Sequence, residues 1–163
     1  MDVQVLTISD ANVIIDIEKG ELTSALFSLS NMSFFVPDVL FEKELYEKHS
    51  HLKERGLNLC KLSGDSVAEV FKLAQQHGKV SSLDLFALQL AIEKSAILLT
   101  GDKALRKVAE KYKVECHGTL WLVELMVKQR IIKQTVAANA YKMMEDAGSR
   151  LPWKDAVSRL KNI

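Results

Sequence analysis

The sequence has few of the residues that mark cross-linked, fibrous or disordered proteins. It contains 2 cysteines, 2 prolines and 7 glycines among 163 residues. Two cysteines cannot build the disulfide framework of a small secreted domain, and Cys60 and Cys116 lack a second cysteine at metal-site spacing. The scarcity of proline and glycine excludes a collagen-like chain and argues against a disordered one. We therefore expect one compact domain in which both cysteines are reduced thiols.

Long apolar runs are also missing. No segment reaches the roughly 18 apolar residues that a membrane-spanning helix needs. Residues 1–10 alternate like a β-strand and lack the basic flank that begins a signal peptide. The prediction is a cytoplasmic protein with no membrane partner.

The residues that are present suit a globular domain with an uneven charge distribution. The chain is 48% hydrophobic and 26% charged, which is enough apolar material for a core. Its net charge is +1, but acidic residues are in excess over residues 1–84 and basic residues over residues 85–163. A basic surface beside carboxylates is typical of a nuclease, although solvated helix faces would give the same pattern.

Short apolar runs alternate with helical stretches along the chain. Strands are expected at 3–9, 33–37, 57–62, 96–99 and 114–117. Helices are expected at 13–29 (interrupted near Gly20), 38–55, 66–77, from 81 onward, 103–112, 119–129, 135–147 and 153–160. In the helix at 66–77, the apolar face is predicted to contain Val67, Val70, Phe71 and Ala74.

This alternation predicts an α/β fold with a mainly parallel central sheet and helices on both faces. Residues 1–118 would form the core. Residues 119–163 would form a C-terminal helical extension packed on that core, within a single domain. Leu120, Val123, Leu125 and Met126 of its first helix are expected to cover the sheet.

Carboxylates stand near the ends of the predicted strands, where ligands bind in parallel α/β sheets. Asp10 follows the first strand, Glu42 and Glu44 lie beyond the second, Asp84 begins a central helix, and Asp102 follows the strand at 96–99. Each acid has a simpler explanation as a helix cap, a partner of a helix dipole or a solvated side chain. Together at one sheet edge they would repel each other unless a cation neutralised them, and oxygen ligands favour Mg²⁺ or Mn²⁺. The pattern therefore predicts metal-assisted phosphodiester hydrolysis.

Four segments carry a family resemblance. They are SDANVIID at 9–16, VPDVLFEKEL at 36–45, DLFALQLA at 84–91 and LLTGDKALR at 98–106. In this order and at these separations they resemble the PIN domain (PilT N-terminus) ribonucleases. That family is metal-dependent and includes the toxins of bacterial and archaeal toxin–antitoxin pairs.

The resemblance implies a three-layer α/β/α fold and assigns roles to the acids. Asp10, Asp84 and Asp102 correspond to the metal-binding acids of the family. The catalytic glutamate falls on Glu42 or Glu44: Glu44 precedes a leucine as in the family, whereas Glu42 better matches the distance from the preceding proline. Both remain candidates.

Other polar residues flank the predicted site. Asn12 and Thr100 resemble the residues that orient the acids in the family, although turn hydrogen bonding would also explain them. Lys103, Arg106 and Lys107 would lie on adjacent positions of a helix and receive substrate phosphate, or simply face solvent. No aromatic-interleaved RNA platform is visible in the sequence.

Other chemistries have little support. His49 and His51 are two residues apart, so on a continuous helix they would point to different sides, and no third ligand completes a zinc site. The sequence contains no phosphate-binding P-loop, no dinucleotide-binding glycine motif and no serine nucleophile elbow.

The leading hypothesis is a Mg²⁺- or Mn²⁺-dependent endoribonuclease that acts on RNA. It would be either a toxin restrained by a cognate antitoxin or a free-standing RNA-processing enzyme, and the resemblance also implies a homodimer. Two alternatives remain: a non-catalytic PIN-like module that binds RNA or protein, and a phosphatase or DNA nuclease with similar metal chemistry.

Overall fold

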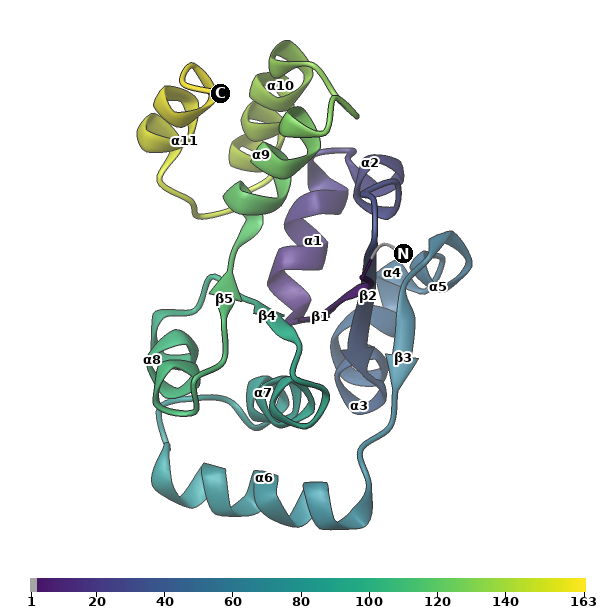
Figure 1. Ribbon diagram of the computed structural model, residues 1–163, viewed down its shortest axis with the longest axis vertical. Helices are drawn as coiled ribbons and strands as arrows, with labels where there is room; N and C mark the ends of the chain where they lie inside the picture. Colours follow the sequence, from purple (N-terminus) through teal and green to yellow (C-terminus); the bar gives the residue numbers. More distant parts are fainter. Residues whose placement is uncertain (1–2) are drawn as a thin grey trace.

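Five strands form a single parallel sheet in the computed structural model, which describes residues 3–163 (Figure 1). They are β1 (Val5–Ser9), β2 (Met32–Pro37), β3 (Asn58–Cys60), β4 (Ile97–Leu99) and β5 (Cys116–His117). The order is β3-β2-β1-β4-β5, and every neighbouring pair is parallel. The predicted α/β fold is confirmed, while the first two residues of the stretch 1–10 lie outside the described residues.

The register of the central strands fixes where the site forms. β1 lies between β2 and β4, and Ser9 pairs with Leu99. The backbone N–H of Asp10 then donates to the carbonyl of Leu99 at 2.9 Å. The residues that follow β1 and β4 therefore emerge side by side at the carboxyl edge of the sheet, where the strand order reverses.

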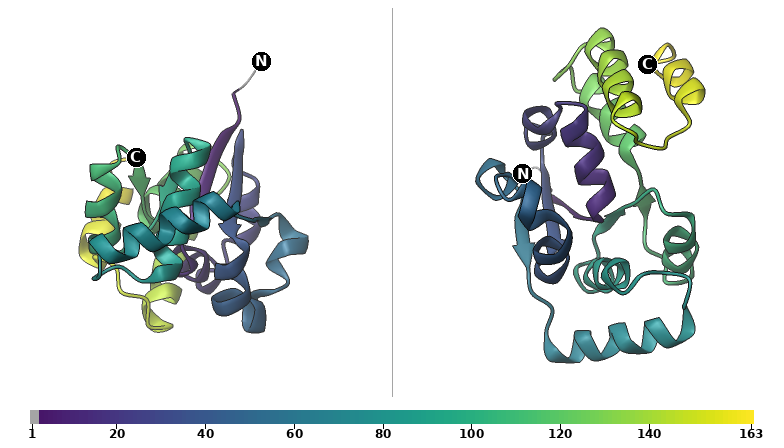
Figure 2. Two further views of the ribbon diagram at one scale, coloured as in Figure 1. Left: turned by 90° about the horizontal axis from the view of Figure 1, so that it is seen from below. Right: turned by 180° about the vertical axis from the view of Figure 1, so that it is seen from behind.

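Helices cover both faces of this sheet. They are α1 (Ala11–Lys19), α2 (Thr23–Phe27), α3 (Asp38–Leu40), α4 (Tyr46–His49), α5 (Leu52–Arg55), α6 (Gly64–Gln76), α7 (Ser82–Lys94), α8 (Lys103–Lys111), α9 (Thr119–Lys128), α10 (Gln134–Asp146) and α11 (Trp153–Leu160). α7 packs on β1, β2 and β4, and α6 lies outside α7. Figures 1 and 2 show α1 on the opposite side of the sheet from α7.

The central helix α7 is apolar on nearly every side. Its buried residues include Leu85, Leu88 and Leu90, each 0% exposed. A helix that is hydrophobic all round belongs in the interior. Ser81 caps its first turn and Ser95 ends it in the left-handed conformation, with φ of 50°. The helix therefore holds Asp84, in its first turn, at a fixed position.

The predicted continuous helix at 38–55 is wrong. After α3 the chain forms a π-helical turn, η1 (Phe41–Leu45), in which the N–H of Tyr46 donates to the carbonyl of Phe41. The wide turn buries Phe41 and Leu45 while the three residues between them stay exposed. A second break separates α4 from α5, so four short pieces replace one helix.

The predicted apolar face of α6 is also wrong in part. Val70 and Leu73 are buried there, but the side chain of Phe71 is 66% exposed. The reason is that α6 packs mainly against a single helix, α7. Such packing covers only a narrow line of side chains, and Phe71 lies outside it.

The C-terminal helices pack on helices rather than on the sheet. α9 contacts α1, α2 and α10, and α10 also contacts α1, which corrects the expectation that α9 covers the strands. Gly20 allows the close approach: an added Cβ would lie 2.6 Å from Cε of Met144 and 3.3 Å from Cβ of Ala140. Figure 1 shows α9, α10 and α11 gathered at one end of the molecule. These contacts support the division that we propose, a core of residues 1–118 with an extension of residues 119–163.

The helices and the cysteines of the described residues bear on what kind of protein this is. Among the helices of residues 3–163, none is long and apolar enough to cross a membrane. Cys60 and Cys116 are both free thiols, as predicted.

Candidate functional site

Asp10 stands at the junction between the central strand and the first helix. Its side chain is 2% exposed and caps α1: Oδ1 accepts a hydrogen bond from the N–H of Val13 at 2.9 Å. Oδ2 accepts from the hydroxyl of Thr100 at 2.6 Å. A carboxylate has about four lone-pair positions, so each oxygen keeps one for a further partner.

Thr100 connects two of the acids. Its buried hydroxyl donates to Asp10 and accepts from the backbone N–H of Asp102 at 3.1 Å. Asp102 in turn caps α8 through Leu105, whose N–H donates to Oδ1 at 2.9 Å. Asp102 itself is exposed at the mouth of the site. The capping explanation of Asp10 and Asp102 therefore holds, and the caps also fix both carboxylates in place.

Asp84 approaches the same region from the other side of the sheet edge. It lies in the first turn of α7, where its backbone N–H donates to the hydroxyl of Ser81 at 3.2 Å. Its side chain is half-buried. Capping thus orients all three aspartates, each at the start of a different helix.

The pKa values show that these carboxylates interact. Burial raises the pKa of Asp10 from 3.8 to about 6, with further increases from the charges of Asp84 and Asp16 and opposing hydrogen bonds from Thr100 and Val13. Burial and the charge of Asp102 also raise the pKa of Asp84, against a hydrogen bond with Ser81. Negative charge is therefore concentrated here, and within the described residues none of these aspartates forms an ion pair with a Lys, Arg or His side chain.

The two glutamate candidates lie on the π-helical turn, and both are exposed. Burial and the charge of Asp84 raise the pKa of Glu44. Glu44 also lines a cavity with Ile15 and Lys19 of α1, whereas Glu42 does not line it. The charge of Asp84 thus acts on Glu44, which also lies on the cavity wall beside α1.

A polar cavity of about 340 Å³ opens at the acids. Its walls include Asp10, Asn12, Asp16, Asp102 and Arg150. Asn12 is exposed on α1, and Arg150 comes from the segment between α10 and α11. The cavity therefore combines the strand ends of the core with the C-terminal extension.

Asp16 is the residue of this cavity that the sequence reasoning missed. Its Oδ1 accepts from the hydroxyl of Ser149 at 2.6 Å and its Oδ2 from that of Thr119 at 3.1 Å. The signal was present, because Asp16 follows Asn12 by four residues and so lies on the same face of α1. Its partners could not be foreseen, since they lie more than 100 residues away in sequence.

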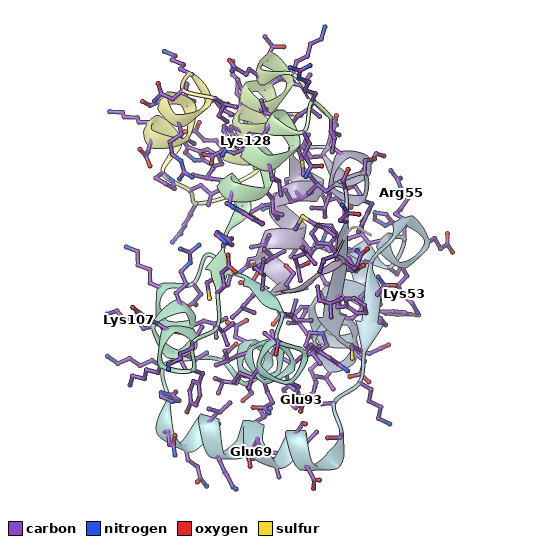
Figure 3. The ribbon with its side chains drawn as sticks, viewed as in Figure 1. Lys53, Arg55, Glu69, Glu93, Lys107 and Lys128 are labelled. Carbon is purple, nitrogen blue, oxygen red and sulfur yellow. The ribbon has the colours of Figure 1, made fainter. Side chains whose placement is uncertain are left out.

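The three basic candidates do not face one place. Lys103 and Arg106 line a cavity next to the acids, together with Gly101. Lys107 lines a different cavity with Gln76, on the side of α8 that faces the end of α6, and Lys103 borders both cavities. Figure 3 shows Lys107 at the outside of the molecule.

The candidate donor set consists of carboxylates, whose oxygens are the ligand type of hard divalent cations. Within the described residues, no three His, Cys, Asp or Glu side chains converge closely enough to enclose an ion. This arrangement does not suit zinc, which takes three or four protein ligands. It fits Mg²⁺ or a similar hard ion, because such ions are held by one or two carboxylates and keep several waters.

The relative orientation of His49 and His51 differs from the one that the sequence predicts. Both rings contact Glu18: Nδ1 of His49 lies 3.0 Å from Oε2, and Nε2 of His51 lies 2.9 Å from Oε1. The prediction that they diverge is wrong because α4 ends at His49, so the two residues are not on one continuous helix. These contacts attach the segment of α4 and α5 to α1.

Comparisons with known proteins agree with this arrangement. A family profile with the description PIN domain matches residues 6–162. Seventeen chains among solved structures match. One is a PilT N-terminus domain protein from the hyperthermophilic archaeon Sulfolobus solfataricus P2, with 16% identity and a TM-score of 0.52, covering 76% of this chain and 92% of that chain.

That likeness shows the fold alone, and no curated protein matches the chain. The family profile is broader evidence, because it spans nearly all of the sequence and includes every candidate acid and all of the strands except the first residue of β1. The chain therefore belongs to the PIN domain family.

Proposed function

We propose that this protein is a metal-dependent endoribonuclease that hydrolyses RNA phosphodiester bonds at the edge of the sheet. PIN domains are generally nucleases. The observation that carries the proposal is the buried carboxylate of Asp10, which interacts with Asp84 and shares the hydroxyl of Thr100 with the backbone of Asp102.

The charge distribution supports a divalent cation at this point. Burial and neighbouring carboxylates raise the pKa values of Asp10, Asp84 and Glu44, and a bound cation would relieve that unfavourable charge. We propose that Asp10, Asp84 and Asp102 surround Mg²⁺ or Mn²⁺, with one or two of them as direct ligands and the others acting through bound waters, and with Glu44 as the fourth acid. Such an ion supplies Lewis acidity and an activated water.

Residues of this chain orient the acids and would bind the substrate. The hydroxyl of Thr100 and the N–H of Val13 hold Asp10 in one orientation. Lys103 and Arg106 offer positive charge beside the acids, where they can bind a substrate phosphate. Asn12, exposed on the cavity wall, offers an amide to a water or a phosphate oxygen.

The first experiment is cleavage of a pool of structured and single-stranded RNAs with Mg²⁺, Mn²⁺ or EDTA. The Asp10→Asn and Asp102→Asn variants are tested beside the wild type, after circular dichroism confirms that they fold. We expect cleavage that requires the metal and falls at least a hundredfold in both variants. Metal-independent RNA binding without cleavage, retained in both variants, would favour the non-catalytic module instead.

A second pair of variants tests the choice of glutamate. We expect Glu44→Gln to lower the cleavage rate at least tenfold, because Glu44 interacts with Asp84, and Glu42→Gln to leave it nearly unchanged. The two substitutions are matched in chemistry and lie on the same turn. The reverse result would assign the role to Glu42.

Substrate class and cellular role need separate measurements. DNA oligonucleotides and phosphomonoesters as competitors distinguish a ribonuclease from a DNA nuclease or a phosphatase. A toxin would arrest growth when expressed without its antitoxin, and the arrest would disappear in Asp10→Asn; an RNA-processing enzyme would not arrest growth. Light scattering at micromolar concentration tests the homodimer that we also propose.

A further inference from the structure

A second cavity adjoins the acid site. It also measures about 340 Å³, and it shares Gly101, Thr119 and Leu151 with the cavity that contains Asp10 and Asp102. The two cavities therefore meet at the carboxyl edge of the sheet. The volume is at the lower end of the range for small-molecule sites, about 300–1,000 Å³, which suits a single nucleoside and not a duplex.

The wall of this cavity contains a flat aromatic pair. The rings of His117, on β5, and Trp121, on α9, are stacked with centroids 4.0 Å apart and planes inclined by 12°. Both residues are only partly buried. Sequence patterns do not reveal this platform, because the pair is formed across a strand-to-helix junction and not by alternating aromatics on one strand.

Positive charge stands beside the aromatic pair. Nε of Arg106 donates to the carbonyl of Thr100 at 3.0 Å, so the same residue that binds Asp10 also fixes this guanidinium. Gly118 leaves room for it, since an added Cβ would lie 3.0 Å from Nη2 of Arg106. In the part of the chain that the structure describes, neither Lys103 nor Arg106 forms an ion pair.

The third cation of the cavity is compensated. Nε of Arg159 lies 2.7 Å from Oε1 of Glu124, whose side chain is 9% exposed. Arg159 thus closes one wall, while Lys103 and Arg106 remain available to an anion. An aromatic surface with uncompensated cations beside it is how proteins bind unpaired nucleotides: bases stack on the rings and phosphates meet the charges.

We propose that this cavity is a nucleoside subsite for single-stranded RNA, with a base stacking on the Trp121–His117 pair and its phosphate held by Arg106 and Lys103. The proposal rests on the proposed ribonuclease function, because it places the base next to the acids that would cleave the strand. A subsite of this kind selects unpaired RNA, since a base within a helix cannot enter the cavity.

The test measures binding without cleavage. Labelled hexa-adenylate is titrated with protein in EDTA, and fluorescence anisotropy gives the affinity for wild type, Trp121→Leu and Trp153→Phe. We expect Trp121→Leu to weaken binding about tenfold or more, in the range for loss of one stacked base. Trp153, which packs against Tyr141 and does not line the cavity, is the matched control and should change affinity less than twofold.

A second measurement leaves the aromatic pair intact. In Trp153→Phe, Trp121 is the sole tryptophan, and hexa-adenylate should quench its emission with the affinity found by anisotropy. An abasic ribose-phosphate hexamer, which has no base to stack, should bind the wild type weakly. Its affinity should match that of hexa-adenylate for Trp121→Leu. This result would remain informative if Trp121→Leu failed to fold.

The outcomes separate the two proposals. If RNA is cleaved but Trp121→Leu binds as tightly as wild type and Trp121 is not quenched, the subsite is wrong and the nuclease stands. If binding depends on Trp121 but no metal supports cleavage, the subsite stands and the nuclease is wrong.

Discussion

At the scale of single residues, the burial of Asp10 determines how it responds to pH. Its pKa is raised from 3.8 to about 6, chiefly because burial disfavours the charged form. The folded protein thus holds this proton more tightly than the unfolded chain does. The resulting stabilisation is complete below about pH 4 and is lost as the pH rises to about 6.

Asp10→Asn should remove this dependence in EDTA. A shift of about two pKa units corresponds to about 3 kcal/mol. We expect the unfolding free energy of the wild type to fall by roughly this amount relative to the variant between about pH 4 and about pH 6. Urea denaturation across that range measures the difference, and parallel profiles for the two proteins would contradict it.

Thr100→Val should uncouple the two neighbouring acids. The change removes a hydroxyl that donates to Asp10 and accepts from the backbone of Asp102. We expect a loss of about 1–3 kcal/mol in stability, because a buried oxygen loses its partner. The acidic limb of the pH–rate profile should move to higher pH, since the bond lowers the pKa of Asp10. Thr100→Ser retains the hydroxyl and serves as the control; equal effects in both variants would refute the role of the hydrogen bond.

At the scale of helices, the contact between α1 and α10 depends on Gly20, which has no side chain. Gly20→Ala would place a Cβ 2.6 Å from Cε of Met144. We expect a destabilisation of about 1–3 kcal/mol, as for other overpacked positions. Gly64→Ala meets no atom within 4 Å and should be nearly neutral. Thermal unfolding of both variants compares them, and equal melting temperatures would mean that the helices can separate at little cost.

Local patterns predicted most of the elements because the core strands are short apolar runs and because four of the longer helices, α1, α6, α7 and α8, begin at a side-chain cap. All five strands and the aspartates at their ends could be anticipated in this way. The break at the π-helical turn could not, since it depends on burying both Phe41 and Leu45 against elements distant in sequence. For the same reason Asp16 and the pair of His117 and Trp121 emerged only in three dimensions.

At the scale of the whole molecule, the net charge is small but the charges are unevenly distributed along the chain. Basic residues are in excess over the second half of the chain, and four of them line the two adjoining cavities. Arg159 is paired with Glu124, whereas Lys103, Arg106 and Arg150 form no ion pair within the described residues. Binding of single-stranded RNA should therefore depend on salt even though the net charge is only +1.

We expect the logarithm of the affinity to fall with the logarithm of salt concentration with a slope of about −2, as three phosphate contacts on a single strand would give. Arg106→Gln should make the slope shallower by about 0.7. Lys128→Gln, at the far end of α9, should leave it unchanged (Figure 3). Anisotropy titrations at several salt concentrations provide the slopes, and a wild-type slope near zero would rule out this contribution of phosphate contacts.

The long-range hydrogen bonds also determine when the site can exist during protein synthesis. Asp10 and Thr100 are 90 residues apart, and the bond from Ser149 to Asp16 spans 133 residues. A nascent chain that has not yet passed α10 therefore contains all the candidate acids and Thr119, but it lacks Ser149, the other partner of Asp16, and the cavity wall at 148–151. For the ribonuclease proposed above, the complete cavity would therefore form only when translation is nearly finished.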